Sequence, residues 1–284
     1  MQWRDSRRSG NIEDRRGNRL GGGVGLGIGG LVVAIVAAYC GVDPALLSTL
    51  VGSGSQVSAG SNVPVRETAE EAELRDFVSA VLAETEDVWK EQFAQRGDQY
   101  HEPTLVLFRQ AVESACGQAS SAVGPFYCPP DQKVYLDLDF LDQLHSQLGA
   151  PGDFAQAYVI AHEIGHHVQN LLGISDQVHA AQQRAGRDQS NELSVRLELQ
   201  ADFLAGVWAH HADRMRHILE QGDLEEALNA ASRIGDDVLQ RAATGHVTPD
   251  SFTHGTAAQR VRWLKRGMES GRLEDGDTFA AKNL

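Results

Sequence analysis

The sequence predicts an α+β fold, mostly helical with a small sheet, behind one N-terminal transmembrane helix. Three observations lead to this prediction. An uncharged segment runs from Leu20 to Val42, short strand-like runs occur between residues 104 and 138, and apolar residues at helical spacing dominate residues 67–96 and the second half of the chain. Few strands beside several long helices are typical of the α+β class.

The charge of the chain limits its partners. The 284 residues are enough for one large domain or two small ones, and the formal net charge is −14. Residues 1–19 hold six arginines against Asp5, Glu13 and Asp14, a net of +3, so −17 remains for the residues after them. Because nucleic-acid binding needs clustered Lys and Arg at the phosphates, we expect no nucleic-acid partner.

The uncharged segment at residues 20–42 has the length of a membrane span. Residues 24–42 alone would cover about 28 Å as a helix, close to the roughly 30 Å hydrocarbon core of a bilayer. The preceding arginines predict a cytoplasmic basic N-terminus at residues 1–19. The rest of the chain would then face the periplasm or another extracytoplasmic side of the inner membrane. A cleaved signal peptide is the alternative, but the long polar leader with its acids favours a single-pass anchor.

Residues 43–66 are rich in Gly and Ser, which is the composition of a flexible linker, so the folded domain is expected at residues 67–284. In an oxidising compartment Cys116 and Cys128 are expected to form a disulfide. It would close a loop of about a dozen residues and contribute about 3 kcal/mol. A metal site of the CxxC type is the alternative, and the spacing of the cysteines argues against it.

Regular elements are expected in the following order. A helix covers residues 67–96, and strand-like runs follow at residues 104–108, 125–128 and 133–138, separated by Gly, Pro and Ser. Helices are then expected over residues 140–148, 153–172, 191–211, 224–241 and 256–270. Asp153 is a plausible N-cap of the second of these helices, and Gly173 ends it.

The helix at residues 153–172 contains the sequence "IAHEIGHHVQN". His162 and His166 are four residues apart, so their Cβ atoms lie about 5–6 Å from each other on one helix face. Two imidazoles at that spacing can bind a single zinc ion with Zn–N bonds near 2 Å. Glu163 is rotated off this stripe and is placed to act on a metal-bound water. This is the HExxH pattern, in which the Glu is a base and not a ligand.

A third ligand is expected from the helix at residues 191–211, which contains "ELQAD". Catalytic zinc takes three protein ligands and one open position. Glu198 is the predicted ligand, and Asp202, on the same face, is predicted to accept the free N–H of a ligating histidine. Two alternatives remain: the two acids exchange roles, or they form a solvated helix face. His167 points off the stripe and is expected at the surface or beside the ligands.

HExxH followed by "ELQAD" resembles the gluzincin metallopeptidases. Over nearly its full length the sequence resembles the bacterial neutral zinc metallopeptidase family of the YpfJ type, in stretches that include "WRDSRRSGNIEDRR", "GPFYCPPDQKVYLD", "GDFAQAYVIAHEIGHHVQ" and "PDSFTHGTAAQRVRWLKRG". The resemblance implies a zincin-like fold, Zn²⁺ as cofactor, peptide or protein substrates and a membrane anchor. It also implies that residues 124–136 hold the edge strand that lines the cleft and pairs with an extended substrate.

The stretch "FTHGTAAQR" at residues 252–260 resembles a Thr-His element with a following Arg in related gluzincins. This resemblance implies that His254 reaches the cleft and stabilises the oxyanion of the tetrahedral intermediate. Arg260 would support the loop or a nearby acid. The alternative is that Thr253 or His254 caps the helix that follows.

Together these features predict a membrane-anchored zinc metalloendopeptidase, in which a zinc-activated water attacks the peptide bond and Glu163 is the general base. The alternative is a catalytically silent zinc-binding membrane scaffold or adaptor for envelope proteins. A structural zinc site is closed by four protein ligands, commonly including Cys. Glu163 instead has the position of a catalytic base beside the proposed ligands, and this favours the enzyme.

Overall fold

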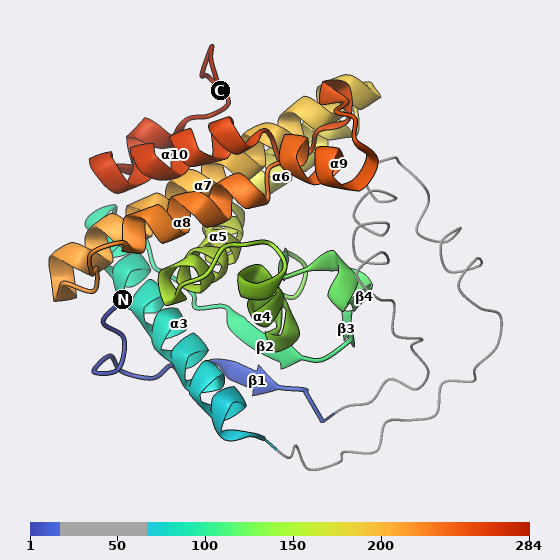
Figure 1. The fold of residues 1–284 in the computed structure, drawn as a ribbon. Helices are drawn as coiled ribbons and strands as arrows, with labels where there is room; N and C mark the ends of the chain where they lie inside the picture. The colour runs from blue at the N-terminus through green and yellow to red at the C-terminus, as the bar shows by residue number, and fades with distance from the viewer. Residues whose placement is uncertain (18–66) are drawn as a thin grey trace.

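The structure, a computed structural model, describes residues 1–17 and 67–284, which form a small mixed sheet and a larger group of helices (Figure 1). The sheet has the strand order β1-β2-β6-β5. Its parallel strands are β1 (Ile12–Asp14), β2 (Thr104–Phe108) and β6 (Lys133–Asp137), and the edge strand β5 (Phe126–Cys128) runs antiparallel to β6. A separate antiparallel hairpin consists of β3 (Ala111–Ser114) and β4 (Gly117–Ser120).

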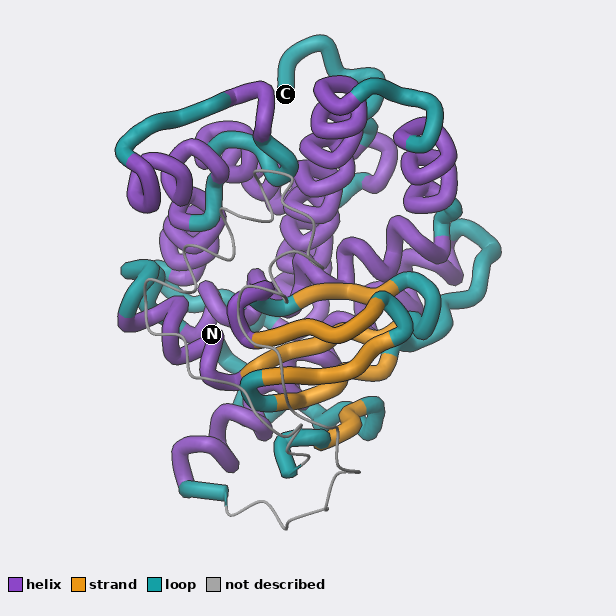
Figure 2. The backbone as a smooth tube through the Cα atoms, turned by 90° about the vertical axis from the view of Figure 1, so that its right-hand side faces the viewer, coloured by secondary structure: helices purple, strands orange, loops and turns teal. Residues whose placement is uncertain are grey.

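The helices lie beside the strands, which Figure 2 shows gathered in one region. They are α3 (Ala69–Gln95), α4 (Leu138–Ser146), α5 (Asp153–Leu171), α6 (Ile174–Gln182), α7 (Arg187–Arg216), α8 (Asp223–Arg233), α9 (Asp236–Thr244) and α10 (Ala257–Ser270). Short 3-10 turns are η1 (Ser121–Val123), η2 (Pro249–Ser251) and η3 (Leu273–Gly276). Helix α5 packs against α3, α7 and α8, while α10 packs against α7 and α8.

The two faces of the sheet bury different sets of side chains, because successive residues of a strand point to opposite faces. Leu105 and Leu107 of β2 join the main core with α3, α5 and α7. Val106 and Phe108 face the other way, into a smaller cluster that includes Cys128 of β5. The sheet therefore has one face toward the helix that carries the HExxH pattern and one face toward the hairpin.

The mixed helix and sheet content agrees with the sequence, but several boundaries differ. The expected helix at residues 224–241 is two helices, α8 and α9, interrupted at Gly235. A Cβ atom at Gly235 would lie 2.3 Å from the backbone nitrogen of Ala257, so only glycine fits at the point where the chain passes the start of α10. Gly152, not Asp153, is the N-cap of α5. The hairpin, strand β1 and helix α6 were not expected.

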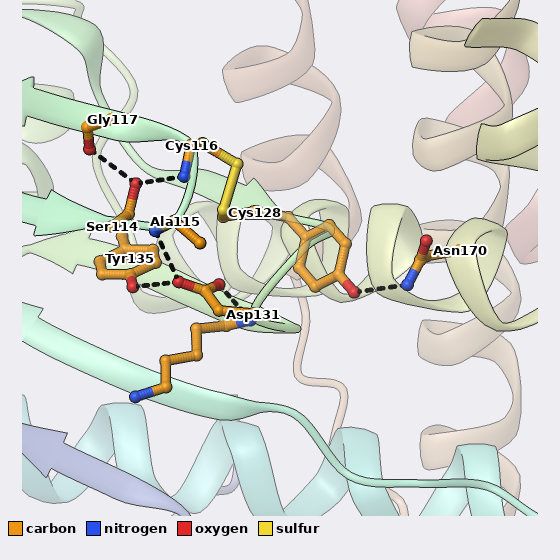
Figure 3. The surroundings of a disulfide bond; sticks show 10 residues. Ser114, Ala115, Cys116, Gly117, Cys128, Asp131, Tyr135 and Asn170 are labelled. Atoms are coloured by element: carbon orange, nitrogen blue, oxygen red, sulfur yellow. Dashed lines mark hydrogen bonds between the residues drawn. A yellow bond between two sulfur atoms is a disulfide. The ribbon is translucent and has the colours of Figure 1, made fainter. Parts of the chain in front are cut away.

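The predicted disulfide between Cys116 and Cys128 is confirmed, with Cα atoms 5.8 Å apart (Figure 3). It joins the turn between β3 and β4 to the edge strand β5. The bond lies on the sheet face opposite α5, since Cys128 belongs to the smaller cluster. The hairpin is thereby anchored to the edge of the sheet.

The prediction of a transmembrane helix is corrected by the structure. Across residues 1–17 and 67–284, every helix is too short or too polar to cross a bilayer. The segment proposed as the span, residues 20–42, and the proposed linker, residues 43–66, lie outside the described residues. The predicted inner-membrane localisation with an extracytoplasmic domain is corrected as well. The reason is that residues 1–17 pack against the domain that was expected on the other side of the membrane.

Residues 1–17 are packed onto the same body as the helices. Strand β1 pairs with β2, with Ile12 opposite Leu105, and the backbone N–H of Leu105 donates to the carbonyl of Asn11 at 2.8 Å. Trp3 is buried with its ring 5.3 Å from that of Phe77. A chain that crossed a membrane once at residues 20–42 would place these partners on opposite sides. The single-pass topology is therefore incompatible with the pairing of β1 and β2.

Candidate metal centre

Helices α5 and α7 approach each other closely at the position of the two sequence motifs. Gly165 lies between the two histidines of HExxH and faces Ala201, which lies between Glu198 and Asp202 on α7. A Cβ atom at Gly165 would be 2.9 Å from the carbonyl oxygen of Ala201. Only hydrogen at this position allows the two backbones to come this close.

The close approach brings together three side chains predicted as ligands. Nε2 of His162 lies 3.1 Å from one carboxylate oxygen of Glu198, and Nε2 of His166 lies 3.4 Å from the other. The ligand atoms of all three lie within 4.8 Å of one another. Two atoms bound to one zinc ion at about 2.0–2.1 Å with tetrahedral angles lie about 3.3–3.4 Å apart. The spacing is therefore close to that of a zinc ligand set.

The other ring nitrogen of each histidine, Nδ1, is hydrogen-bonded to a side-chain acceptor. Nδ1 of His162 donates to Oδ1 of Asp202 at 2.9 Å, and Nδ1 of His166 donates to Oε1 of Gln169 at 2.9 Å. The amide of Gln169 is oriented by its own N–H, which donates to the carbonyl of Leu197 at 2.7 Å. Both imidazoles are thus oriented with Nδ1 protonated and Nε2 toward Glu198, where Nε2 carries either a proton or the lone pair that binds a metal.

The electrostatics of this cluster fit a cation. Burial by itself would lower the pKa of His162, but Asp202 and Glu198 outweigh it and raise that pKa to about 10. Burial would raise the pKa of Glu198, but the neighbouring His166 and His254 hold it well below its usual range. Two nitrogen lone pairs and a carboxylate that face one another repel unless positive charge lies between them. The donor set fits zinc, which binds imidazole nitrogen and carboxylate oxygen.

Asp202 is the centre of a buried polar network behind His162. Its carboxylate accepts two hydrogen bonds from Arg260, at 2.8 and 2.9 Å, and one from the hydroxyl of Tyr158 at 2.5 Å. Burial would raise the pKa of Asp202, but Arg260 and His162 outweigh it and lower the pKa to about 2. Of the two roles expected for Arg260, the structure therefore has the pairing with a nearby acid. Asp202 has no oxygen directed at Nε2 of either histidine, which disfavours it as the ligand.

Glu163 occupies the next position of α5 after His162 and is 8% exposed. It is the predicted base and lies within the same buried helix turn as the first histidine. His254 approaches the cluster from the loop before α10. Burial would lower the pKa of His254, but the carboxylates of Glu198 and Asp236, the latter 3.6 Å from Nδ1, outweigh burial and raise it.

The loop that carries His254 is organised by Asp236, the first residue of α9. One oxygen of Asp236 accepts the backbone N–H groups of Thr253, His254 and Gly255 at 2.8, 2.7 and 3.0 Å. The alternative, in which Thr253 or His254 caps α10, is wrong. Thr256 is the N-cap, and it forms a capping box with the residue three positions later.

Three supporting residues were not predicted. Tyr158 and Gln169 lie one helix turn from His162 and His166, at spacings of four and three residues, so helical periodicity could have identified them. Asp236 has no local signal, because its partners are 17 to 19 residues away. His167, expected at the surface or beside the ligands, is fully buried and contacts strand β5 instead.

Comparison with known proteins agrees with the geometry. Residues 1–279 match the family model described as "Putative neutral zinc metallopeptidase". The chain belongs to this family. It is 50% identical to the protein YpfJ of Escherichia coli (strain K12), an uncharacterized protein, over 98% of this chain and 99% of the relative. It is 44% identical to the uncharacterized protein Rv2575 of Mycobacterium tuberculosis (strain ATCC 25618 / H37Rv), over 65% of each chain. No solved structure is significantly similar.

Membership of the neutral zinc metallopeptidase family confirms the resemblance seen in the motifs and makes zinc the cofactor. It also places the chain among zinc metallopeptidases, whose substrates are peptides or proteins.

Proposed function

We propose that the chain is a zinc-dependent metalloendopeptidase with His162, His166 and Glu198 as the zinc ligands. One observation carries the proposal: two Nε2 atoms in fixed tautomers and one carboxylate from a second helix converge, with Glu163 on the adjacent helix position. Three protein ligands leave a fourth zinc position open to solvent, as in catalytic and not structural sites.

The bound metal would polarise the scissile carbonyl and lower the pKa of the attacking water. Glu163 accepts the proton of that water and then donates it to the leaving amine, so it is base first and acid second. Asp202 keeps Nδ1 of His162 protonated, and Arg260 keeps Asp202 ionised in its buried position. No covalent intermediate with the protein is required.

His254 is proposed to donate a hydrogen bond to the oxyanion of the tetrahedral intermediate. The proposal is supported by its raised pKa, which favours the protonated ring, and by the three backbone hydrogen bonds that anchor its loop to Asp236. A preorganised donor at a developing negative charge typically contributes about 10²–10³ in rate. Asp236 is proposed to hold the loop in place.

The substrate is proposed to bind as an extended strand beside β5. This strand is at the edge of the sheet and packs against α5, which carries the HExxH residues. Edge strands bind peptides through backbone hydrogen bonds, with pockets for alternate side chains. The predicted cleft strand at residues 124–136 contains β5 and most of β6, and the proposal assigns the pairing to β5 because β6 has neighbours on both sides.

The test combines zinc content with peptide hydrolysis. We expect Glu163→Gln to retain one zinc ion per chain and to lose hydrolysis by at least about 10³-fold, within the usual contribution of general acid–base catalysis. We expect His166→Ala to lose both zinc and hydrolysis. Wild-type activity in Glu163→Gln would rule out the mechanism. A folded, zinc-loaded wild-type protein that cleaves no protein or peptide substrate would instead support the catalytically silent zinc-binding scaffold.

A further inference from the structure

Strand β5 has little backbone support of its own. It has three residues, Phe126, Tyr127 and Cys128, and its only partner within the described sheet is β6. A strand held on one side by so few hydrogen bonds takes its position from its side chains. The contacts of these side chains therefore decide where β5 lies relative to α5.

Two of the three side chains point away from α5. The ring of Phe126 stacks on that of Tyr135 with centroids 4.8 Å apart and planes at 7°. Cys128 is bonded to Cys116 on the same face of the sheet (Figure 3). Because side chains alternate along a strand, Tyr127 points to the opposite face, and it packs against the main core there.

The hydroxyl of Tyr127 connects β5 to α5 through two hydrogen bonds. It lies 3.0 Å from Nδ1 of His167 and 3.1 Å from Nδ2 of Asn170 (Figure 3 shows the bond to Asn170). Nε2 of His167 lies 2.7 Å from the carbonyl oxygen of His101, so Nε2 must be the protonated nitrogen and Nδ1 the acceptor. Tyr127 therefore donates to His167 and accepts from Asn170. The direction of every bond in the chain is determined.

This linkage uses the same helix turn as the candidate metal centre. His167 directly follows the proposed ligand His166, and Asn170 lies four residues after that ligand. His167 is fully buried, and its ring also contacts the ring of Tyr127 with centroids 5.3 Å apart. One turn of α5 thus presents a zinc ligand on one side and the attachment of β5 on another. The offset between metal and strand is therefore set by this turn together with the ring and the hydroxyl group of Tyr127.

We propose that Tyr127 and His167 are positioning residues that set the register of the substrate strand relative to the zinc ion. The inference rests on the proposed function, in which an extended peptide pairs with β5. Without the hydroxyl, β5 would keep its stacked ring, its disulfide and the contact of the Tyr127 ring with His167, but would lose both hydrogen bonds to α5. The scissile carbonyl would then be held less accurately, and a displacement of about 1 Å lowers a rate by about 10²-fold.

The test is Tyr127→Phe, which removes only the hydroxyl, measured with one long peptide substrate. We expect kcat to fall tenfold or more while the zinc content stays at the wild-type value. We also expect new cleavage positions, one or two residues from the wild-type bond, in mass spectra of the products. A residue that merely stabilised the fold would lower the melting temperature and leave kcat and the cleaved bond unchanged.

Three further variants complete the experiment. Tyr135→Phe is the matched control, because it removes a hydroxyl that donates to Asp131 at 2.7 Å, away from α5, and we expect wild-type kcat and cleavage position. His167→Gln can still accept from Tyr127 and donate to the carbonyl of His101, so we expect it to retain most of the kcat that His167→Leu loses. This pair tests the linkage even if Tyr127→Phe folds poorly.

The outcomes separate the two proposals. A wild-type protein that binds zinc and cleaves no peptide defeats the proposed function and this inference together. A wild-type protein that cleaves the peptide, with Tyr127→Phe cutting the same bond at the same kcat, overturns the inference alone. The inference is equally overturned if His167→Gln and His167→Leu are impaired to the same degree.

Discussion

The amide oxygen of Gln169 lies 2.9 Å from Nδ1 of His166, and it serves this histidine as Asp202 serves His162. The two proposed ligands are therefore supported by groups of different charge. A carboxylate backs the first histidine, and a neutral amide backs the second. Gln169 is fully buried and also joins α5 to α7 through Gln200, at 3.1 Å.

The first prediction concerns this amide. Gln169→Met keeps the length of the side chain but removes the acceptor for His166, so the ring is free to adopt the other tautomer. Loss of such a partner typically lowers metal affinity by about 10–100-fold. We expect that decrease in zinc affinity, measured by competition with a chelator. Gln156→Met is the control, because Gln156 lies on the same helix but donates to the carbonyl of Leu141 and not to a ligand. It should bind zinc as the wild type does.

The second prediction concerns the contact of α5 with α7. In Gly165→Ala the new methyl group would lie 2.9 Å from the carbonyl oxygen of Ala201, so the helices must separate. Overpacking of this kind lowers the free energy of unfolding by about 1–3 kcal/mol. We expect weaker zinc binding as well, because Glu198 would move away from the histidines. Gly186→Ala has open space around it and is the control. Unchanged zinc affinity in Gly165→Ala would show that the close approach is not needed.

The third prediction concerns the buried pair of Arg260 and Asp202, whose residues are 2% and 0% exposed. Arg260→Met leaves the carboxylate buried without its main partner, which typically destabilises a protein by about 3–5 kcal/mol. Urea denaturation of the metal-free protein measures this loss. Adding Asp202→Leu to Arg260→Met should recover part of it, because neither charge of the pair then remains. Lys265→Met, in an exposed pair, should change stability by less than about 1 kcal/mol.

The fourth prediction is a pH dependence at the N-terminal strand. Glu13 of β1 pairs with Arg15 and with Lys133 of β6, and these contacts lower its pKa from 4.5 to about 2. A carboxyl group whose pKa is lower in the folded state adds stability above its ordinary pKa of 4.5, and that contribution is lost as pH falls through about 2. Since Glu13 is 41% exposed, we expect an effect below about 1 kcal/mol.

Urea unfolding of the wild type and of Glu13→Gln at several pH values measures their free energies of unfolding and tests the fourth prediction. The wild type should be more stable than the variant at pH 7, and the two curves should converge as the pH approaches 2. Hydrogen exchange in β1 should report the same difference locally. A gap between the two proteins that widens with acid would contradict the assignment of the charge pair.

Much of the site could be predicted because its signals are local. His162 and His166 lie on one helix face by spacing alone, and so do Glu198 and Asp202. The apolar rows of both helices indicated which faces turn inward. Each of these inferences needs only the geometry of one helix or one short loop.

What the sequence by itself determined is the approximate position of most helices, the spacing of the proposed ligands and membership of a zinc metallopeptidase family. Tertiary structure alone decided the long-range contacts that support those ligands, which are the bond of Gln169 across to α7 and the hydrogen bonds of Asp236 to the loop of His254. It also decided that residues 1–17 add a strand to the sheet, which the charge pattern had assigned to another compartment. The physical reason is that spacing along a helix repeats every 3.6 residues, whereas the pairing of Ile12 with Leu105 depends on packing across the whole core.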